Sequence, residues 1–147
     1  MIVYLISYWV LVISYFKPVI PIPVFSTEIK TEDLLPNSVI EDCLAKLKVA
    51  FEEKKLYLDP ELTLQSLAAE INIPARTIST VLNSTMQKNF RDYINSYRVE
   101  EAKRLLEDYR ERNLTIAAVA YDAGFNSLAT FQRVFKKMTG KTPKEFT

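Results

Sequence analysis

Apolar side chains recur at intervals of three and four along most of this chain, the spacing that places them on one face of an α-helix. The pattern predicts a first helix over residues 37–55, ending before the Asp59-Pro60 break. Two short helices follow, one after Thr63 and one opening at Pro74, and the longest helix covers residues 89–108. The apolar stripe of the first helix consists of Val39, Ile40, Cys43, Leu44, Leu47, Ala50 and Phe51.

The pattern of the two short helices returns later in the chain. Residues 62–71 match residues 114–123 at an offset of 52, and residues 78–82 match residues 131–135 at an offset of 53. Asn72 and Gly124 end the first helix of each pair, and both residue types suit the left-handed conformation of a helix stop. Pro74 corresponds to Ser127, a good N-cap. A short terminal helix is expected after the capping box that begins at Thr142.

Each pair is a short helix, a tight turn and a second helix with a polar outer face. This arrangement is typical of a helix-turn-helix, whose second helix enters the major groove of DNA. The pairs cover about residues 63–83 and 115–138. The predicted fold is therefore all-α, with two helix-turn-helix subdomains joined by a long linker helix within a domain of residues 37–147.

The second helix of the later pair is strongly amphipathic. Its predicted buried face carries Phe131, Val134, Phe135 and Met138. Its other face starts small and apolar and ends basic, with Leu128, Ala129, Gln132, Arg133, Lys136 and Lys137. Such a face fits a groove that is edged by phosphates.

The chain begins with an apolar segment, residues 1–25, followed by a polar linker, residues 26–36. The opening run MIVYLISYWVLVISYF is slightly shorter than the about 20 residues of a spanning helix, and prolines follow it. We interpret it as a membrane segment or marginal tether, and a buried or partner-covered apolar arm is the alternative. If the run spans a membrane, Lys17 favours a cytoplasmic domain, tethered to the inner face of the plasma membrane.

Composition excludes most enzyme chemistry. The chain has no histidine, two glycines and one cysteine, so a Gly-rich phosphate loop, a histidine base and a cysteine–histidine metal site are all unavailable. Cys43 lies on a predicted apolar stripe and is expected to be core filler. We therefore expect no enzyme activity, no cofactor and no metal.

Charge is distributed unevenly although the net charge is only +1. Residues 26–71 carry five basic and ten acidic side chains, whereas residues 72–147 carry thirteen basic and eight acidic ones. The asymmetry indicates an anionic partner for the second half, and solvated helix faces are the alternative explanation.

Residues 116–146, IAAVAYDAGFNSLATFQRVFKKMTGKTPKEF, resemble the carboxy-terminal DNA-binding domain of the AraC/XylS family of bacterial transcription regulators. The family pattern is met at Ile116, Val119, Ala120, Gly124, Phe125, Ser127, Phe131, Arg133, Phe135, Lys136, Gly140, Thr142 and Pro143. Residues 90–106 resemble the family's linker helix. The apolar start is similar to that of members with a membrane-embedded sensor, which implies a truncated member.

The resemblance implies a sequence-specific regulator of transcription that binds double-stranded DNA, with RNA polymerase as a further expected partner. The implied base-contacting residues are Ala75, Arg76, Ser79, Thr80, Leu128, Ala129, Gln132 and Arg133. The implied phosphate contacts are Lys88, Arg98, Lys136, Lys137 and Lys141. Leu128 and Ala129 cannot donate a hydrogen bond, so the thymine methyl is what they can read.

The first pair departs from the family pattern at three places. Pro74 replaces the serine cap, residues 82–84 replace the Phe-Lys-Lys of the second pair, and Gln87 stands where the second pair has Gly140. We therefore expect the second recognition helix to contribute more DNA affinity. The competing hypothesis is a membrane-tethered helical interaction module that does not bind DNA. The operator, the effector and the choice between activation and repression stay open.

Overall fold

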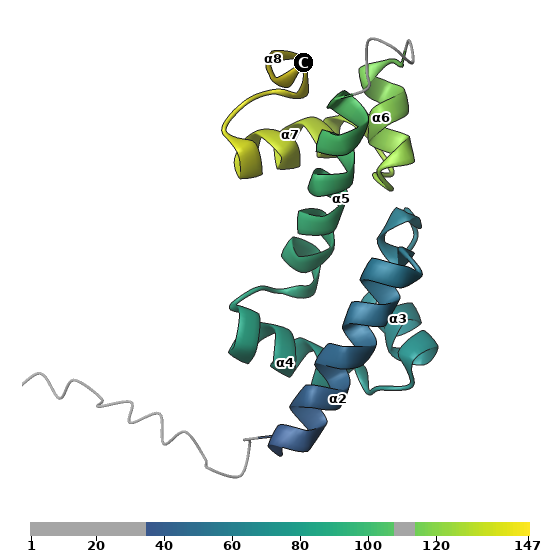
Figure 1. Ribbon diagram of the computed structural model, residues 1–147, viewed down its shortest axis with the longest axis vertical. Coiled ribbons are helices and arrows are strands. Elements are labelled where there is room, and N and C mark those ends of the chain that lie inside the picture. Colours follow the sequence, from purple (N-terminus) through teal and green to yellow (C-terminus); the bar gives the residue numbers. More distant parts are fainter. Residues whose placement is uncertain (1–34, 108–113) are drawn as a thin grey trace, which may run out of the picture. The chain divides into compact units, whose positions relative to one another are not determined.

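The structure is a computed structural model that describes residues 35–107 and 114–147. Every regular element in these two ranges is helical, which confirms the all-α prediction (Figure 1). The predicted membrane segment, residues 1–25, and most of the predicted linker, residues 26–36, lie outside the described residues. Within the described ranges, no helix combines the length and the apolar character that crossing a membrane requires.

The first described helix, α2 (Asn37–Lys48), continues directly into a π-helical turn, η2 (Val49–Glu53). Cys43, Leu47 and Phe51 are fully buried, as the apolar stripe predicted. Burial raises the pKa of the Cys43 thiol above its usual value, so the thiol stays protonated at neutral pH as a core residue does. Val39 is 38% exposed, so its predicted place in the core is wrong.

The first helix-turn-helix pair consists of α3 (Leu64–Ile71) and α4 (Ala75–Met86). The Oγ1 atom of Thr63 accepts from the backbone N–H of Ser66 at 3.0 Å, and the Ser66 Oγ accepts from the Thr63 N–H at 2.9 Å. This reciprocal cap satisfies two donors that the first turn of a helix leaves unpaired. Asn72 has φ 53° and ends α3 in the left-handed conformation, as predicted.

The second pair consists of α6 (Ile116–Asp122) and α7 (Leu128–Thr139), and the short helix α8 (Pro143–Phe146) follows it. Thr115, Ser127 and Thr142 each accept a backbone hydrogen bond as side-chain N-caps. Gly124 has φ 86° and Gly140 has φ 78°. The predicted repeat is therefore confirmed by the matching threonine caps of α3 and α6 and by the left-handed residues that follow the helices of both pairs.

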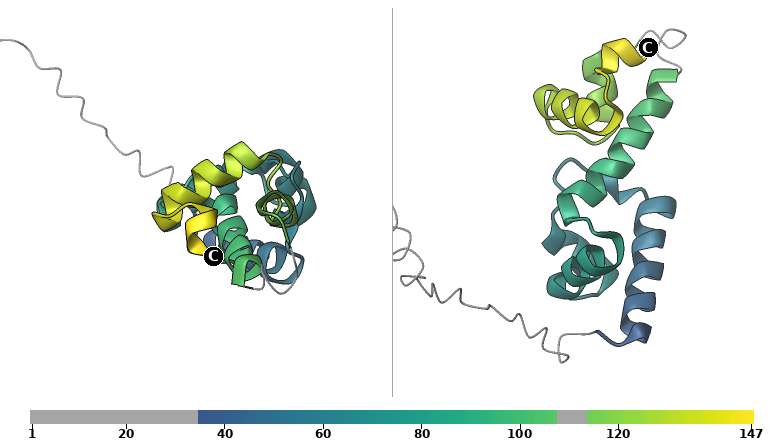
Figure 2. Two further views of the ribbon diagram at one scale, coloured as in Figure 1. Left: turned by 90° about the horizontal axis from the view of Figure 1, so that it is seen from above. Right: turned by 90° about the vertical axis from the view of Figure 1, so that its left-hand side faces the viewer.

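The longest helix, α5 (Phe90–Glu107), contacts both pairs, as Figure 1 and Figure 2 show. Tyr93 and Ile94, near its start, are buried in the core of the first pair. Val99, Ala102, Leu105 and Leu106, further along, are buried in the core of the second pair. The apolar residues of α5 thus serve two cores in succession, one at each end of the helix.

Each pair has a hydrophobic core of its own. In the first, Phe51 lies 4.9 Å from Tyr93 and 5.0 Å from Tyr97 between ring centroids. In the second, Phe131 lies 5.4 Å from Phe135 between ring centroids. Aromatic rings at these separations pack favourably in tilted and edge-to-face arrangements. Each core fixes the buried face of one recognition helix, α4 or α7, and leaves the opposite face outward.

Candidate nucleic-acid interface

The outer face of α7 exposes three of the four residues that the family resemblance implies for base contacts on this helix. Ala129, Gln132 and Arg133 are exposed. Phe131 and Phe135, on the opposite face, are fully buried. Because a helix repeats every 3.6 residues, anchoring the two phenylalanines holds the intervening polar side chains outward. The exposed face is therefore fixed in orientation.

A hollow of about 580 Å³ lies beside this face of α7. Arg133 and Lys136 from α7 and Lys144 from α8 bring three cations to it, and none of its lining residues is acidic. The complete lining is Ile116, Ala129, Gln132, Arg133, Lys136, Thr142, Pro143 and Lys144. A concave surface that is lined by cations and by no acidic side chain suits an anionic backbone such as that of DNA.

Two residues at the predicted buried and exposed faces of α7 differ from expectation. Leu128 is half-buried and packs against the second core, so much of its side chain is committed to the protein. Ala129 remains exposed and keeps the contact with a thymine methyl available. Met138 is 43% exposed, so its predicted place on the buried face is wrong.

The outer face of α4 is less open than that of α7. Arg76 is exposed, but Ala75, Ser79 and Thr80 are half-buried. Pro74 stands at the N-cap and provides no side-chain hydrogen bond, whereas the Ser127 Oγ caps α7 by accepting from the Thr130 N–H at 3.2 Å. The stronger cap and the more exposed polar side chains both belong to the second pair.

The two recognition helices, α4 and α7, lie on the same side of α5 in Figure 1. The predicted phosphate contacts Lys88, Lys136, Lys137 and Lys141 are all exposed. Lys137 also lies 3.8 Å from Asp92 at the start of α5, between the Lys137 Nζ and the Asp92 Oδ1. An exposed ion pair of this length is weak, so Lys137 remains able to turn to a phosphate.

Arg98 does not fit the predicted role of a phosphate contact, because its side chain is buried. It is 9% exposed, and its Nε donates to the Tyr57 carbonyl at 2.8 Å. Its Nη2 donates to the Asp59 carbonyl at 2.7 Å. Burial lowers the pKa of Arg98 and the nearby Asp59 opposes that effect. The guanidinium is bound within the protein because long-range contacts, invisible in the local pattern, supply its acceptors.

Two basic residues escaped the sequence-based prediction. Arg91 lines a hollow of about 360 Å³ between the starts of α3 and α5, and Lys144 lines the hollow beside α7. The two residues are related by the offset of 53 that relates the recognition helices, and each follows an N-cap, Asn89 or Thr142. Extending the repeat past each pair, to α5 after the first and to α8 after the second, would have identified them.

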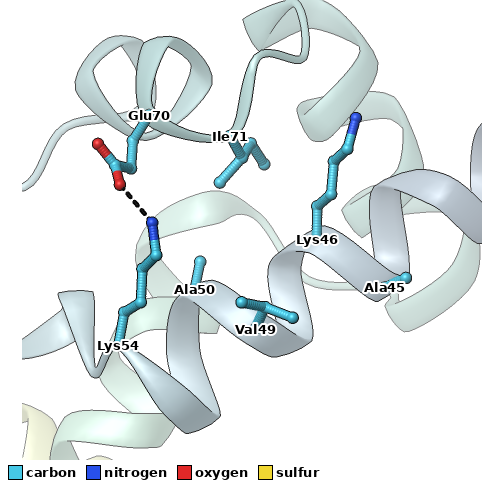
Figure 3. A pocket seen from close by; sticks show the side chains of 7 residues that line it. All are labelled: Ala45, Lys46, Val49, Ala50, Lys54, Glu70 and Ile71. Carbon is cyan, nitrogen blue, oxygen red and sulfur yellow. Dashed lines mark hydrogen bonds and ion pairs between the residues drawn. The ribbon is translucent and has the colours of Figure 1, made fainter.

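A third hollow, of about 330 Å³, lies between α2 and α3 (Figure 3). Its floor is apolar, with Val49, Ala50 and Ile71, and an ion pair of 2.6 Å joins Lys54 to Glu70 across one end. That pair lowers the pKa of Glu70 through the hydrogen bond from Lys54. No set of three or more potential metal ligands gathers in the described ranges. The hollow thus combines an apolar floor with one ion pair at its edge.

Comparison with known proteins places these features in a family. The family model described as a helix-turn-helix domain matches residues 67–147, more than half of the chain. The chain belongs to the AraC-type helix-turn-helix family. Its resemblance to AraC/XylS regulators, first indicated by residues 116–146, is thereby confirmed.

Two curated relatives have names of the same kind. The chain is 30% identical over 118 residues to the uncharacterised HTH-type transcriptional regulator YijO of Escherichia coli K12, covering 78% of this chain and 40% of the relative. It is 35% identical over 88 residues to the uncharacterised HTH-type transcriptional regulator YobQ of Bacillus subtilis 168, covering 60% of this chain and 35% of the relative. The chain thus spans less than half the length of these relatives.

Two solved structures share the fold. The carboxy-terminal domain of the two-component response regulator yesN from Fusobacterium nucleatum is 27% identical, with a TM-score of 0.57, covering 70% of this chain and 97% of that one. The DNA-binding domain of AdpA, solved with a target DNA, is 22% identical, with a TM-score of 0.60, covering 71% and 88%. Each of the two likenesses covers about 70% of this chain at the level of the fold.

Proposed function

We propose that this chain is a sequence-specific, DNA-binding regulator of transcription that inserts α4 and α7 into successive major grooves. The observation that carries the proposal is the pair of helix-turn-helix units whose recognition helices, α4 and α7, lie on one side of α5 in Figure 1 and keep Arg76 and Arg133 exposed. Successive major grooves on one side of B-DNA are about 34 Å apart, so two such helices in one chain can read two half-sites.

The exposed side chains suggest which residues contact bases and which contact phosphates. Arg133 has the reach and the two-pronged donor geometry to bind guanine, and Gln132 can pair with adenine. Arg76 is the corresponding long donor on α4. Phosphates would be contacted by the lysines at positions 88, 136, 137 and 141, together with Arg91 and Lys144. The base contacts proposed for Ala75, Ser79, Thr80 and Leu128 are weaker, because these side chains are half-buried.

The wider role of the chain follows from the same proposal. Residues 37–147 would form the DNA-binding domain of a cytoplasmic protein, with RNA polymerase as a partner in transcription. The apolar segment of residues 1–25 would tether it to the inner face of the plasma membrane or would be covered by a partner. A regulator of this kind is not an enzyme and uses no cofactor.

Salt dependence of DNA binding tests the proposal. With six to ten phosphates neutralised, log affinity of the full-length chain should fall by about 5 to 9 units per unit of log salt. The double variant Lys136→Ser/Lys144→Ser should reduce that slope by about 2, because each phosphate contact contributes about 1. Lys48→Ser on α2 is the matched control and should leave the slope unchanged. Fluorescence anisotropy at five salt concentrations gives all three slopes.

A slope near zero, or no DNA binding at low salt, would overturn the proposal. The helical pairs would then serve protein contacts, which is the competing hypothesis. Equal slopes for the wild type and for the Lys136→Ser/Lys144→Ser variant would place the phosphate contacts elsewhere.

The two recognition helices are expected to contribute unequally. Arg133→Ala should cost about 1–3 kcal/mol of binding free energy and relax the preference at one base position. Arg76→Ala should cost less, because α4 lacks a side-chain cap and the three proposed base-contacting side chains beside Arg76 are half-buried. Titration of both variants on the same duplex measures the difference. A larger loss for Arg76→Ala would reverse the ranking.

A further inference from the structure

Residues 55–59 form a loop where three parts of the fold meet. The loop belongs in sequence to the first half, between η2 and α3, and contains the 3-10 turn η3 (Leu56–Leu58). Lys55 opens it with φ 49°, in the left-handed region. Two residues from far along the chain, Arg98 on α5 and Gly124 in the α6–α7 turn, approach its backbone.

Arg98 holds this loop by two charged hydrogen bonds. Its Nε donates to the Tyr57 carbonyl at 2.8 Å and its Nη2 donates to the Asp59 carbonyl at 2.7 Å. A charged donor that is 9% exposed is stable only when its donors are satisfied. The planar fork of a guanidinium also sets the direction of both bonds, which a single donor cannot do.

The α6–α7 turn meets the same loop. A side-chain Cβ at Gly124 would lie 2.4 Å from the Tyr57 carbonyl oxygen and 2.8 Å from the Leu58 Cα, so the turn and the loop touch backbone to backbone. The ring of Phe125, the next residue, is 1% exposed, and its centroid lies 5.8 Å from the guanidinium carbon of Arg98. A guanidinium within about 6 Å of an aromatic ring is attracted to its face.

We propose that Arg98 is a positioning residue that joins the two helix-turn-helix units and thereby fixes the spacing of DNA half-sites that the chain accepts. It connects the first-half loop to α5 and, through Phe125, to the turn that leads into α7. We call these contacts of Arg98 with the loop and with Phe125 the junction. With the junction intact, α4 and α7 hold one separation and one rotational phase. Without it, the two units move more independently about α5. The inference rests on the proposed function, since only a DNA-binding chain has half-sites to space.

The consequence for binding follows from linking two modules. A rigid connection of the right geometry gives the second binding event a high effective concentration, and a loose one gives a lower value but tolerates more spacings. Loss of the junction should therefore weaken binding to the natural spacing and flatten the dependence on spacing. Affinity for a single half-site should stay the same, because neither recognition face contains Arg98.

The test compares the full-length wild type with Arg98→Met, which keeps the length of the side chain and removes all donors, and with Arg98→Lys, which cannot bond both carbonyls. Lys103→Met is the matched control, because Lys103 is a cation on α5 that pairs with Glu100 and not with the loop. The probes are 30-bp duplexes selected by the wild type from a randomised library, the same duplexes with 1, 2 or 5 bp inserted between the half-sites, and duplexes with one half-site scrambled.

Arg98→Met should bind the uninterrupted duplex about tenfold more weakly, bind single half-sites within twofold of wild type, and show a smaller penalty for each insertion. Arg98→Lys should fall between Arg98→Met and wild type, and it carries the test if Arg98→Met does not fold. An insertion profile identical to that of wild type would overturn the proposal. A parallel loss on single half-sites would also overturn it, because that pattern indicates general destabilisation.

If the wild type selects no duplex, the proposed DNA-binding function fails, and the junction is then judged by distance alone. Spin labels on Ser84→Cys of α4 and Met138→Cys of α7, in a Cys43→Ala background, report the separation of the two helices. Pulsed electron paramagnetic resonance should give a narrow distance distribution for the labelled protein with its native Arg98 and for Lys103→Met. It should give a broader distribution for Arg98→Met. An unchanged width in Arg98→Met would refute the junction.

Discussion

Gly124→Ala should destabilise the chain by about 3 kcal/mol or more. The new Cβ would lie 2.4 Å from the Tyr57 carbonyl oxygen, a distance at which backbone must move. Overpacking of a tight site typically costs about 1–3 kcal/mol. The left-handed φ of 86° adds a further ~1–2 kcal/mol for a residue with a side chain. Chemical denaturation of wild type and variant measures the difference in unfolding free energy.

Gly140→Ala is the matched control for this substitution. Gly140 has a similar φ of 78°, but a Cβ added there would meet nothing within 4 Å. It should therefore cost only the backbone strain, ~1–2 kcal/mol. Equal losses for the two variants would mean that the contact between the α6–α7 turn and the loop at Tyr57 contributes nothing. A loss at Gly124 that is larger by 1 kcal/mol or more would measure that contact.

Phe135→Ala should cost about 3–5 kcal/mol, the usual range for removing a buried phenylalanine. Phe135 is fully buried in the second core and packs edge-on against Phe131 and Phe146, each with its centroid 5.4 Å away. Removing the ring leaves a cavity directly beneath the recognition face of α7. DNA affinity should fall with stability, because α7 loses the anchor that orients its outer face.

The loss should be local, because Phe135 belongs to the second core and not to the first. Amide hydrogen exchange should accelerate in α6 and α7 while α3 and α4 remain protected. Met138→Ala on the same helix, where the side chain is 43% exposed, should have a small effect and serves as the control. Uniform acceleration across both halves would show that the two cores unfold as one unit.

The N-cap of α8 depends on pH through the carboxylate of Glu145. The pKa of Glu145 is lowered by hydrogen bonds from the Thr142 backbone and side chain. Because this pKa is lowered in the folded state, the cap stabilises α8 fully at pH values above the ordinary pKa of a glutamate. The contribution disappears as the pH falls through the folded-state pKa. The cap of α8 is therefore intact at neutral pH, with Lys144 of that helix beside the hollow of α7.

Local sequence determined both helix-turn-helix pairs. The caps at Thr63, Ser127 and Thr142 and the left-handed stops at Asn72 and Gly124 occur where the pattern predicted them. These features depend on residues within four positions of one another, because a cap and a helical turn are both short-range interactions. The repeat then relates the two halves, and the outward positions on α7 follow from the helical period.

Tertiary structure alone decided which side chains on α5 face which core and what Arg98 binds. The acceptors of Arg98 lie 39 and 41 positions earlier in the chain, and Gly124 meets Tyr57 across 67 positions. No local pattern contains those partners, so a buried arginine and a solvent-facing one look alike in sequence. The same reason explains Val39 and Met138, which lie on apolar stripes yet remain exposed. Periodicity identifies a helical face, but burial also requires another element to cover it, and only the folded chain supplies that element.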